Sequence, residues 1–158
     1  MTPATLRPIV RRALPLGVNA GLDLPALAAV QVSSEQSLFP VDNVFDQQRG
    51  PGGSCWIADQ SGEQLLVLAF RAPTIISRVV VESEHHGGLT RQTIDLAVSH
   101  EGKALLELGT RAFTFRPYGP SFQTETWELP KDPVTELRFR ITPGAGGRAC
   151  LTSIVIHP

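Results

Sequence analysis

The sequence has few cysteines and no long apolar run. Among 158 residues there are two cysteines, Cys55 and Cys150, so one disulfide is possible and a disulfide-rich scaffold is excluded. In a reducing compartment we expect both to be free thiols. No apolar run approaches the roughly 20 residues of a membrane-spanning helix. A single domain of this length can build a hydrophobic core without a metal or a disulfide.

The sequence also lacks an excess of charge of either sign. Its 14 Lys and Arg residues against 15 Asp and Glu residues give a net charge of −1. So small a net charge does not attract nucleic acid or an anionic membrane over a long range, although Arg7, Arg11 and Arg12 could form a local basic patch. We therefore expect no nucleic-acid ligand and no membrane span.

A secretory leader is only loosely suggested. Arg11 and Arg12 could form its charged start, but Asn19 and Asp23 interrupt the apolar stretch that follows. We predict a cytoplasmic location, and a secreted one stays open.

Catalytic motifs are missing as well. There is no Gly-x-Ser-x-Gly, His-Glu-x-x-His or phosphate-binding Walker sequence. Gly144-x-Gly146-x-x-Ala149 matches a loose dinucleotide fingerprint, but the residues after Ala149 are too few for the required helix and are typical of a strand. Cys55 could imitate a cysteine nucleophile, yet nothing in the sequence places a histidine beside it. We predict that the chain is not an enzyme.

Short apolar segments separated by polar breaks make up most of the chain. The segment 65–70 is closed by Arg71-Ala72-Pro73-Thr74, and the apolar segment 75–81 follows. Residues 93–99 and 137–141 alternate apolar with polar side chains, as a strand with one wet face does. Further strands are expected at 104–108, 112–115, 124–129 and 149–156. This pattern, with no long helix, predicts an all-β, antiparallel sandwich or barrel.

The first thirty residues differ from the rest. Pro3, Pro8, Pro15 and Pro25 prevent a long helix there. We expect residues 1–30 to form an N-terminal arm that packs on its own domain or on a second copy, in which case the arm would form a homo-oligomer. Residues 31–158 are expected to form the β-sandwich domain.

A series of short motifs, in this order, resembles a discoidin or coagulation-factor type C (F5/8 type C) domain of the galactose-binding jelly-roll class. The motifs are Ser33-Ser34, Pro40-x-Asp42-Asn43-Val44-Phe45-Asp46, Trp56, Ser99-x-Glu101-Gly102-Lys103 and Leu137-Arg138-Phe139-Arg140-Ile141. The resemblance covers roughly residues 31–157. It implies a two-sheet jelly roll whose loops at one end bind a ligand.

The resemblance also implies a possible structural Ca²⁺. The carboxylate expected to hold it is Asp46, together with backbone carbonyls. The sequence departs from the family pattern at three places: Gln47 stands where the turn usually has glycine, Ala104 and Leu105 replace an aromatic residue, and Ser153-Ile154-Val155 stands where many members have a glutamate. The missing acidic residue near Val155 argues against the ion.

Sugar recognition needs an aromatic face and planar hydrogen-bonding groups, and three loops supply them. The candidate ligand-binding residues are Arg49 and Trp56; His85, His86 and Arg91; and Arg116, Tyr118 and Phe122. With these loops at one end, we predict a non-catalytic module that binds a galactose-like carbohydrate. In the alternative interpretation the loops are scattered surface and Trp56 belongs to the core.

A second function, from a different class, stays open. The chain could be an intracellular protein-interaction, scaffold or oligomerisation domain that binds a protein partner. Arg138 and Arg140 share one face of a strand and could contact an acidic partner, although such charges usually serve solubility. Glu84-His85-His86 is interpreted as a solvated loop, because adjacent histidines lack the spacing of a metal-ligand pair.

Overall fold

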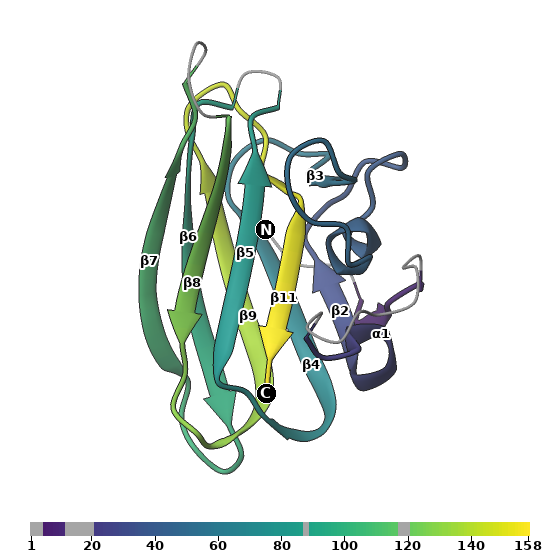
Figure 1. The fold of residues 1–158 in the computed structure, drawn as a ribbon, viewed down its shortest axis with the longest axis vertical. Coiled ribbons are helices and arrows are strands. Elements are labelled where there is room, and N and C mark those ends of the chain that lie inside the picture. The colour runs from purple at the N-terminus through teal and green to yellow at the C-terminus, as the bar shows by residue number, and fades with distance from the viewer. Residues whose placement is uncertain (1–4, 12–20, 87–88, 117–120) are drawn as a thin grey trace.

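In the described part of the chain, two antiparallel sheets pack on each other, as the sequence predicts, and a further pair of strands forms a small third sheet (Figure 1). The computed structural model describes residues 5–11, 21–86, 89–116 and 121–158. A six-stranded sheet has the order β1-β2-β4-β9-β6-β7 and a three-stranded sheet the order β11-β5-β8. The strands of the larger sheet are β1 (Arg7–Pro8), β2 (Ala28–Val32), β4 (Gln64–Ile75), β6 (Arg91–His100), β7 (Leu106–Thr114) and β9 (Pro133–Pro143).

The smaller sheet lies in front of the larger one in Figure 1. Its strands are β5 (Arg78–Glu84), β8 (Phe122–Glu128) and β11 (Ser153–His157). A separate pair, β3 (Trp56–Ile57) and β10 (Cys150–Leu151), lies toward one end of the sandwich. The helices that are described are short: α1 (Leu24–Leu27) and the 3₁₀ turn η1 (Val41–Phe45). No helix among the described residues is long and apolar enough to cross a membrane.

Alternation of side chains along the strands builds the core. On β9, Leu137, Phe139 and Ile141 are buried, whereas Arg138 and Arg140 are exposed. Because successive side chains of a strand point to opposite faces, the apolar set of each sheet meets that of the other.

Several strand boundaries predicted from the sequence are wrong. β4 continues through Arg71–Thr74 to Ile75, and the break comes at Ile76 and Ser77. Pro73 is accommodated because the pairing of β4 with β9 shifts register between Ala69 and Thr74, where no regular ladder hydrogen bond is required.

Two other boundaries also need correction. The two strands expected at 104–108 and 112–115 are one strand, β7. The single closing strand expected at 149–156 is divided into β10 and β11, which pair with β3 and β5 respectively.

The described part of the N-terminal arm packs on its own domain. β1 pairs with β2, and Leu24 is fully buried. Gly21 lies with φ +84° at a close approach to β11, where a Cβ would be 2.6 Å from the carbonyl oxygen of Ile156. β2 begins at Ala28, three residues before the expected start of the domain at residue 31.

Candidate functional site

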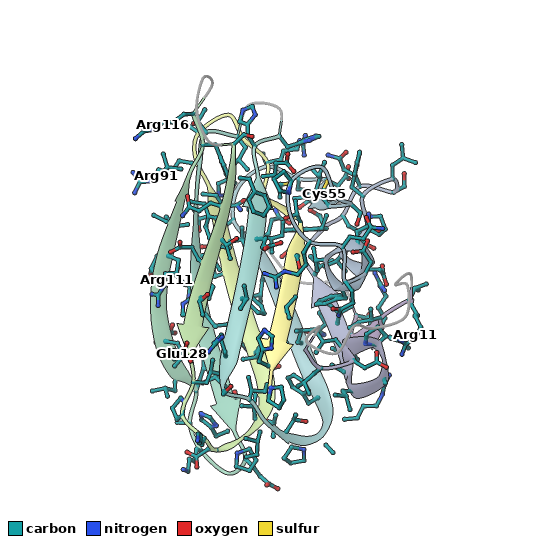
Figure 2. The ribbon with its side chains drawn as sticks, viewed as in Figure 1. Arg11, Cys55, Arg91, Arg111, Arg116 and Glu128 are labelled. Atoms are coloured by element: carbon teal, nitrogen blue, oxygen red, sulfur yellow. The ribbon has the colours of Figure 1, made fainter. Side chains whose placement is uncertain are left out.

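Strand pairing brings most of the predicted ligand-binding residues to one end of the sandwich. The register of β5 with β8 places Glu84 opposite Phe122, so His85 and His86 leave the sheet beside the start of β8. The register of β6 with β7 places Arg91 opposite Thr114, two residues before Arg116. Figure 2 shows Arg91 and Arg116 at this end, with Cys55 near the same end.

The first hollow at this end, called here the arginine hollow, has a volume of about 440 Å³. Its lining residues are Thr114, Arg116, Phe122 and Gln123. Arg116 is exposed, Phe122 is half-buried, and among the described residues Arg116 has no ion-pair partner. The hollow is therefore lined by an exposed guanidinium and by part of an aromatic ring.

Gln123 holds the wall of the arginine hollow in place. Its Oε1 accepts a hydrogen bond from the Thr114 amide at 3.0 Å, and its Nε2 donates to the Ala112 carbonyl at 2.8 Å. One side chain on β8 thus pairs with the backbone of β7 as a neighbouring strand would. This link fixes the edges of the two sheets next to Arg116 and Phe122.

The second hollow, called here the cysteine hollow, has a volume of about 190 Å³. It is lined by Gly53, Cys55, Glu84, His85, His86, Cys150 and Thr152. The His86 ring lies 5.9 Å from the Phe39 ring, and the His85 ring lies 6.4 Å, edge-on, from Phe115. The His85 amide donates to the Ser121 carbonyl at 2.6 Å, so the histidine segment is joined to the loop before β8.

Among the described residues, three of the predicted ligand-binding residues line neither of these hollows: Arg49, Trp56 and Arg91. Trp56 is 0% exposed, and its Nε1 donates to the Ser34 carbonyl at 3.0 Å, so its ring belongs to the core. Arg49 is committed to an ion pair with Glu82 at 2.8 Å. Tyr118 lies outside the described residues.

Asp46 accepts two hydrogen bonds from its own turn region. Its carboxylate accepts hydrogen bonds from the Ser54 hydroxyl and, at 3.0 Å, from the Gln48 amide. Gln47 takes the left-handed conformation, φ 66°, that this tight turn requires. No group of three or more His, Cys, Asp or Glu residues in the described ranges could hold a metal ion. A site made of Asp46 and backbone carbonyls is of a different kind, so Ca²⁺ binding at Asp46 stays a prediction.

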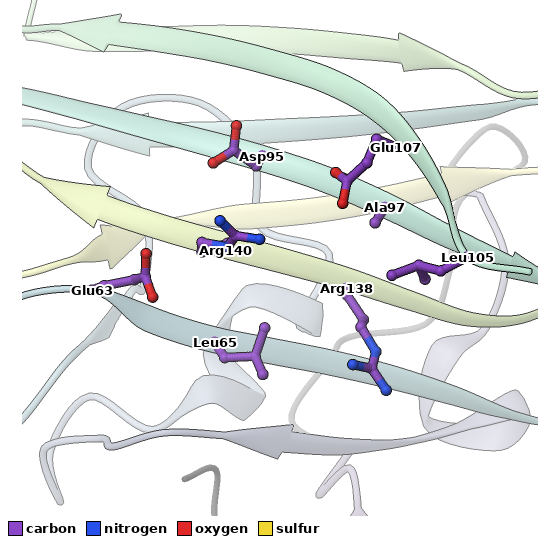
Figure 3. A pocket seen from close by; sticks show the side chains of 8 residues that line it. All are labelled: Glu63, Leu65, Asp95, Ala97, Leu105, Glu107, Arg138 and Arg140. Atoms are coloured by element: carbon purple, nitrogen blue, oxygen red, sulfur yellow. The ribbon is translucent and has the colours of Figure 1, made fainter. Parts of the chain in front are cut away.

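A third hollow, called here the sheet hollow, lies on the outer face of the larger sheet and has a volume of about 210 Å³ (Figure 3). Arg140 on β9 is flanked there by Asp95 on β6 and by Glu63. The other lining residues are Leu65, Ala97, Leu105, Glu107 and Arg138. This hollow has charged planar groups but no aromatic ring among its lining residues.

Sequence reasoning missed several residues of the loop end. Gln123 and Thr114 lie within strands. The local sequence pattern there does not distinguish a residue that lines a hollow from one that is simply exposed to solvent. From the sequence, Cys55 and Cys150 were expected to be free thiols, with one bridge possible. Their shared hollow depends on the pairing of β3 with β10, which motif spacing does not reveal.

Comparison with known proteins finds similar solved structures but no sequence match. No family model matches the sequence, and no curated protein matches it. A family 32 carbohydrate-binding module of Clostridium perfringens NanJ, in complex with galactose, is similar with a TM-score of 0.60 and 12% identity, over 82% of this chain and 92% of that one.

Two further solved structures are similar. The Clostridium perfringens module CpGH89CBM32-5, in complex with GalNAc-β-1,3-galactose, has a TM-score of 0.63 and 14% identity, over 87% and 99% of the two chains. A chitosan-binding module from a Paenibacillus sp. IK-5 chitosanase/glucanase has a TM-score of 0.62 and 14% identity, over 90% and 100%. At these identities the likeness establishes the fold: this chain is a jelly-roll β-sandwich of the kind found in those modules.

Proposed function

We propose that this chain is a non-catalytic carbohydrate-recognition module that binds a galactose-like sugar at the loop end of the sandwich. The observation that carries the proposal is the arginine hollow. A guanidinium donates to vicinal hydroxyl groups, and an aromatic ring packs against the C–H face of a sugar. Arg116 and Phe122 offer these two groups side by side.

The sheet hollow is the competing position for a sugar. It has guanidinium and carboxylate groups, but its apolar lining is aliphatic. Without a ring, this hollow has no aromatic surface against which the C–H face of a pyranose can pack. The solved structures that resemble this chain support carbohydrate as the ligand class, because the Clostridium perfringens modules were solved with galactose-containing ligands.

Isothermal titration with galactose and with GalNAc-β-1,3-galactose tests the position of the site. We expect Arg116→Ala, which removes the hydrogen-bond donor, and Phe122→Ala, which removes the aromatic surface, each to weaken binding at least tenfold. A tenfold change corresponds to about 1.4 kcal/mol of binding free energy. Arg140→Ala is the matched control: it also removes an exposed arginine, but from the sheet hollow. Loss of binding in Arg140→Ala with normal binding in Arg116→Ala would place the sugar on the sheet and overturn the proposed site.

A further inference from the structure

The two cysteines of this chain meet in one hollow. Cys55 directly precedes β3, Cys150 begins β10, and these strands pair antiparallel with Cys150 opposite Ile57. Cys55 and Ile57 are two positions apart and project to the same face of the pair, which is the face of Cys150. Both thiols are free in the structure and both line the cysteine hollow.

Cys150 is held rigidly and is shielded from solvent. It is 1% exposed, and the amide group of the buried Gln92 bonds to both sides of its backbone. Gln92 Nε2 donates to the Cys150 carbonyl at 2.9 Å, and the Cys150 amide donates to Gln92 Oε1 at 3.0 Å. The Ser83 hydroxyl donates to the same carbonyl at 2.7 Å. A reagent in solvent therefore does not reach Cys150 first.

Cys55 is the accessible partner. It is half-buried and lies in the segment that leads into β3, with its carbonyl accepting a hydrogen bond from Asn43 Nδ2 at 2.9 Å. Hydrogen bonding with the Cys150 thiol lowers the pKa of Cys55, against the opposing effects of burial and of Glu84. The same contact and burial raise the pKa of Cys150 well above its usual value. Cys55 is therefore the thiol that more readily becomes the attacking thiolate.

We propose that Cys55 and Cys150 form a reversible disulfide at the floor of the cysteine hollow, by exchange with a low-molecular-weight disulfide. The Cys55 thiolate attacks one sulfur of the reagent, whose sulfur–sulfur bond breaks and releases one thiolate that takes up a proton. Cys150 then loses its proton and attacks the Cys55 sulfur of the mixed disulfide, which releases the second thiol. The protein loses two electrons and two protons, and the reagent becomes two thiols.

This inference is independent of carbohydrate binding, because its evidence is the geometry of the two thiols. The sequence predicts that both cysteines are free thiols in a reducing compartment. The proposal adds that these two thiols react with each other when a disulfide reagent is present. The bond would connect the segment before β3 to β10 in the hollow that His85 and His86 also line, at the loop end of the sandwich.

Exchange of the reduced full chain with glutathione disulfide, in the presence of a chelator, tests the proposal. We expect intact mass and thiol labelling to show both cysteines lost together, with no retained glutathione. Digestion should yield one peptide pair joined through Cys55 and Cys150. Wild-type protein that keeps both thiols, retains glutathione adducts or forms disulfide-linked dimers would overturn the proposal.

Two variants separate the roles of the thiols. Cys150→Ser should stop at a stable glutathione adduct on Cys55, and Cys150→Ala repeats the test if the serine variant does not fold. Cys55→Ser should leave Cys150 unmodified in the folded protein. Equal reactivity of Cys150 in Cys55→Ser and of Cys55 in Cys150→Ser would contradict the assignment of Cys55 as the attacking thiol.

Discussion

Arg7 of the N-terminal arm forms a two-point ion pair with Asp42 of η1. Arg7 Nη1 and Nη2 donate to the two carboxylate oxygens of Asp42, each at 2.8 Å. The Val10 amide donates to the same carboxylate at 2.7 Å, and the Asp42 side chain is 4% exposed. The arm thus supplies the charge and the donors that this buried carboxylate needs.

Removing the guanidinium should destabilise the domain. We expect Arg7→Ala to lower the free energy of unfolding by about 2 kcal/mol, because a buried carboxylate is left without its cation. The loss is smaller than for a fully buried pair, since the Arg7 side chain is 35% exposed to screening water. Urea unfolding measures the change. Arg11→Ala, which breaks the exposed pair with Asp23, is the control and should leave stability nearly unchanged; equal losses in both variants would contradict this account.

The Asp42 carboxylate should also give the stability a defined dependence on pH. Burial alone would raise the pKa of Asp42, but hydrogen bonds from Arg7 and from the Val10 amide outweigh it and hold the pKa below its usual value. A lowered folded-state pKa contributes stability that is complete above the unfolded pKa, about 3.9, and is lost as the pH falls through the folded pKa.

Comparison of wild type with Asp42→Asn isolates that contribution. The difference in the free energy of unfolding should be largest at neutral pH and should shrink as the pH falls below about 4. Urea unfolding at a series of pH values measures it. A difference that stays constant across the acidic range would rule out titration of Asp42 as its source.

Two glutamines that make the same kind of bonds at different depths give a matched test of burial. Gln92 is 0% exposed and pairs with the Cys150 backbone, whereas the half-buried Gln123 pairs with the β7 backbone. Gln92→Leu should cost about 2 kcal/mol, because the buried Cys150 amide loses its acceptor, while the Cys150 carbonyl keeps the hydrogen bond from the Ser83 hydroxyl. Gln123→Leu should cost less than about 1 kcal/mol, because water can replace its bonds. Thermal unfolding compares the two, and a larger loss for Gln123→Leu would contradict the role of burial.

Calcium should have no effect on stability if Asp46 serves only the turn. A bound ion would stabilise the folded state by mass action, so EDTA would lower the melting temperature. We expect EDTA and added Ca²⁺ to change it by less than about 1 °C. Asp46→Ala should destabilise the protein equally in both conditions. A Ca²⁺-dependent rise that disappears in Asp46→Ala would show that the carboxylate holds the ion after all.

Local pattern was sufficient to predict the antiparallel sandwich. The alternation of Leu137 to Ile141 assigns each side chain of that strand to a face, and the structure agrees. The path of β4 through Pro73 was missed because a local rule treats proline as a break, whereas the register shift against β9 makes room for it.

The candidate site was harder to predict than the fold. The sequence could identify Arg116 and Phe122 as suitable chemistry, but their common hollow follows from the pairing of β5 with β8 and of β6 with β7. For Trp56, the chemistry suggested a ligand-binding role that the packing does not support. Its ring is suited to a sugar, yet packing places it in the core, and composition alone cannot distinguish the two positions.

A glycan-array screen of the purified full chain, once with Ca²⁺ and once with EDTA, tests the central proposal most directly. We predict reproducible binding to galactose-terminated glycans that EDTA does not abolish. A blank array from protein shown to be folded by its melting transition would contradict carbohydrate recognition, and a protein partner would then be the ligand class to pursue.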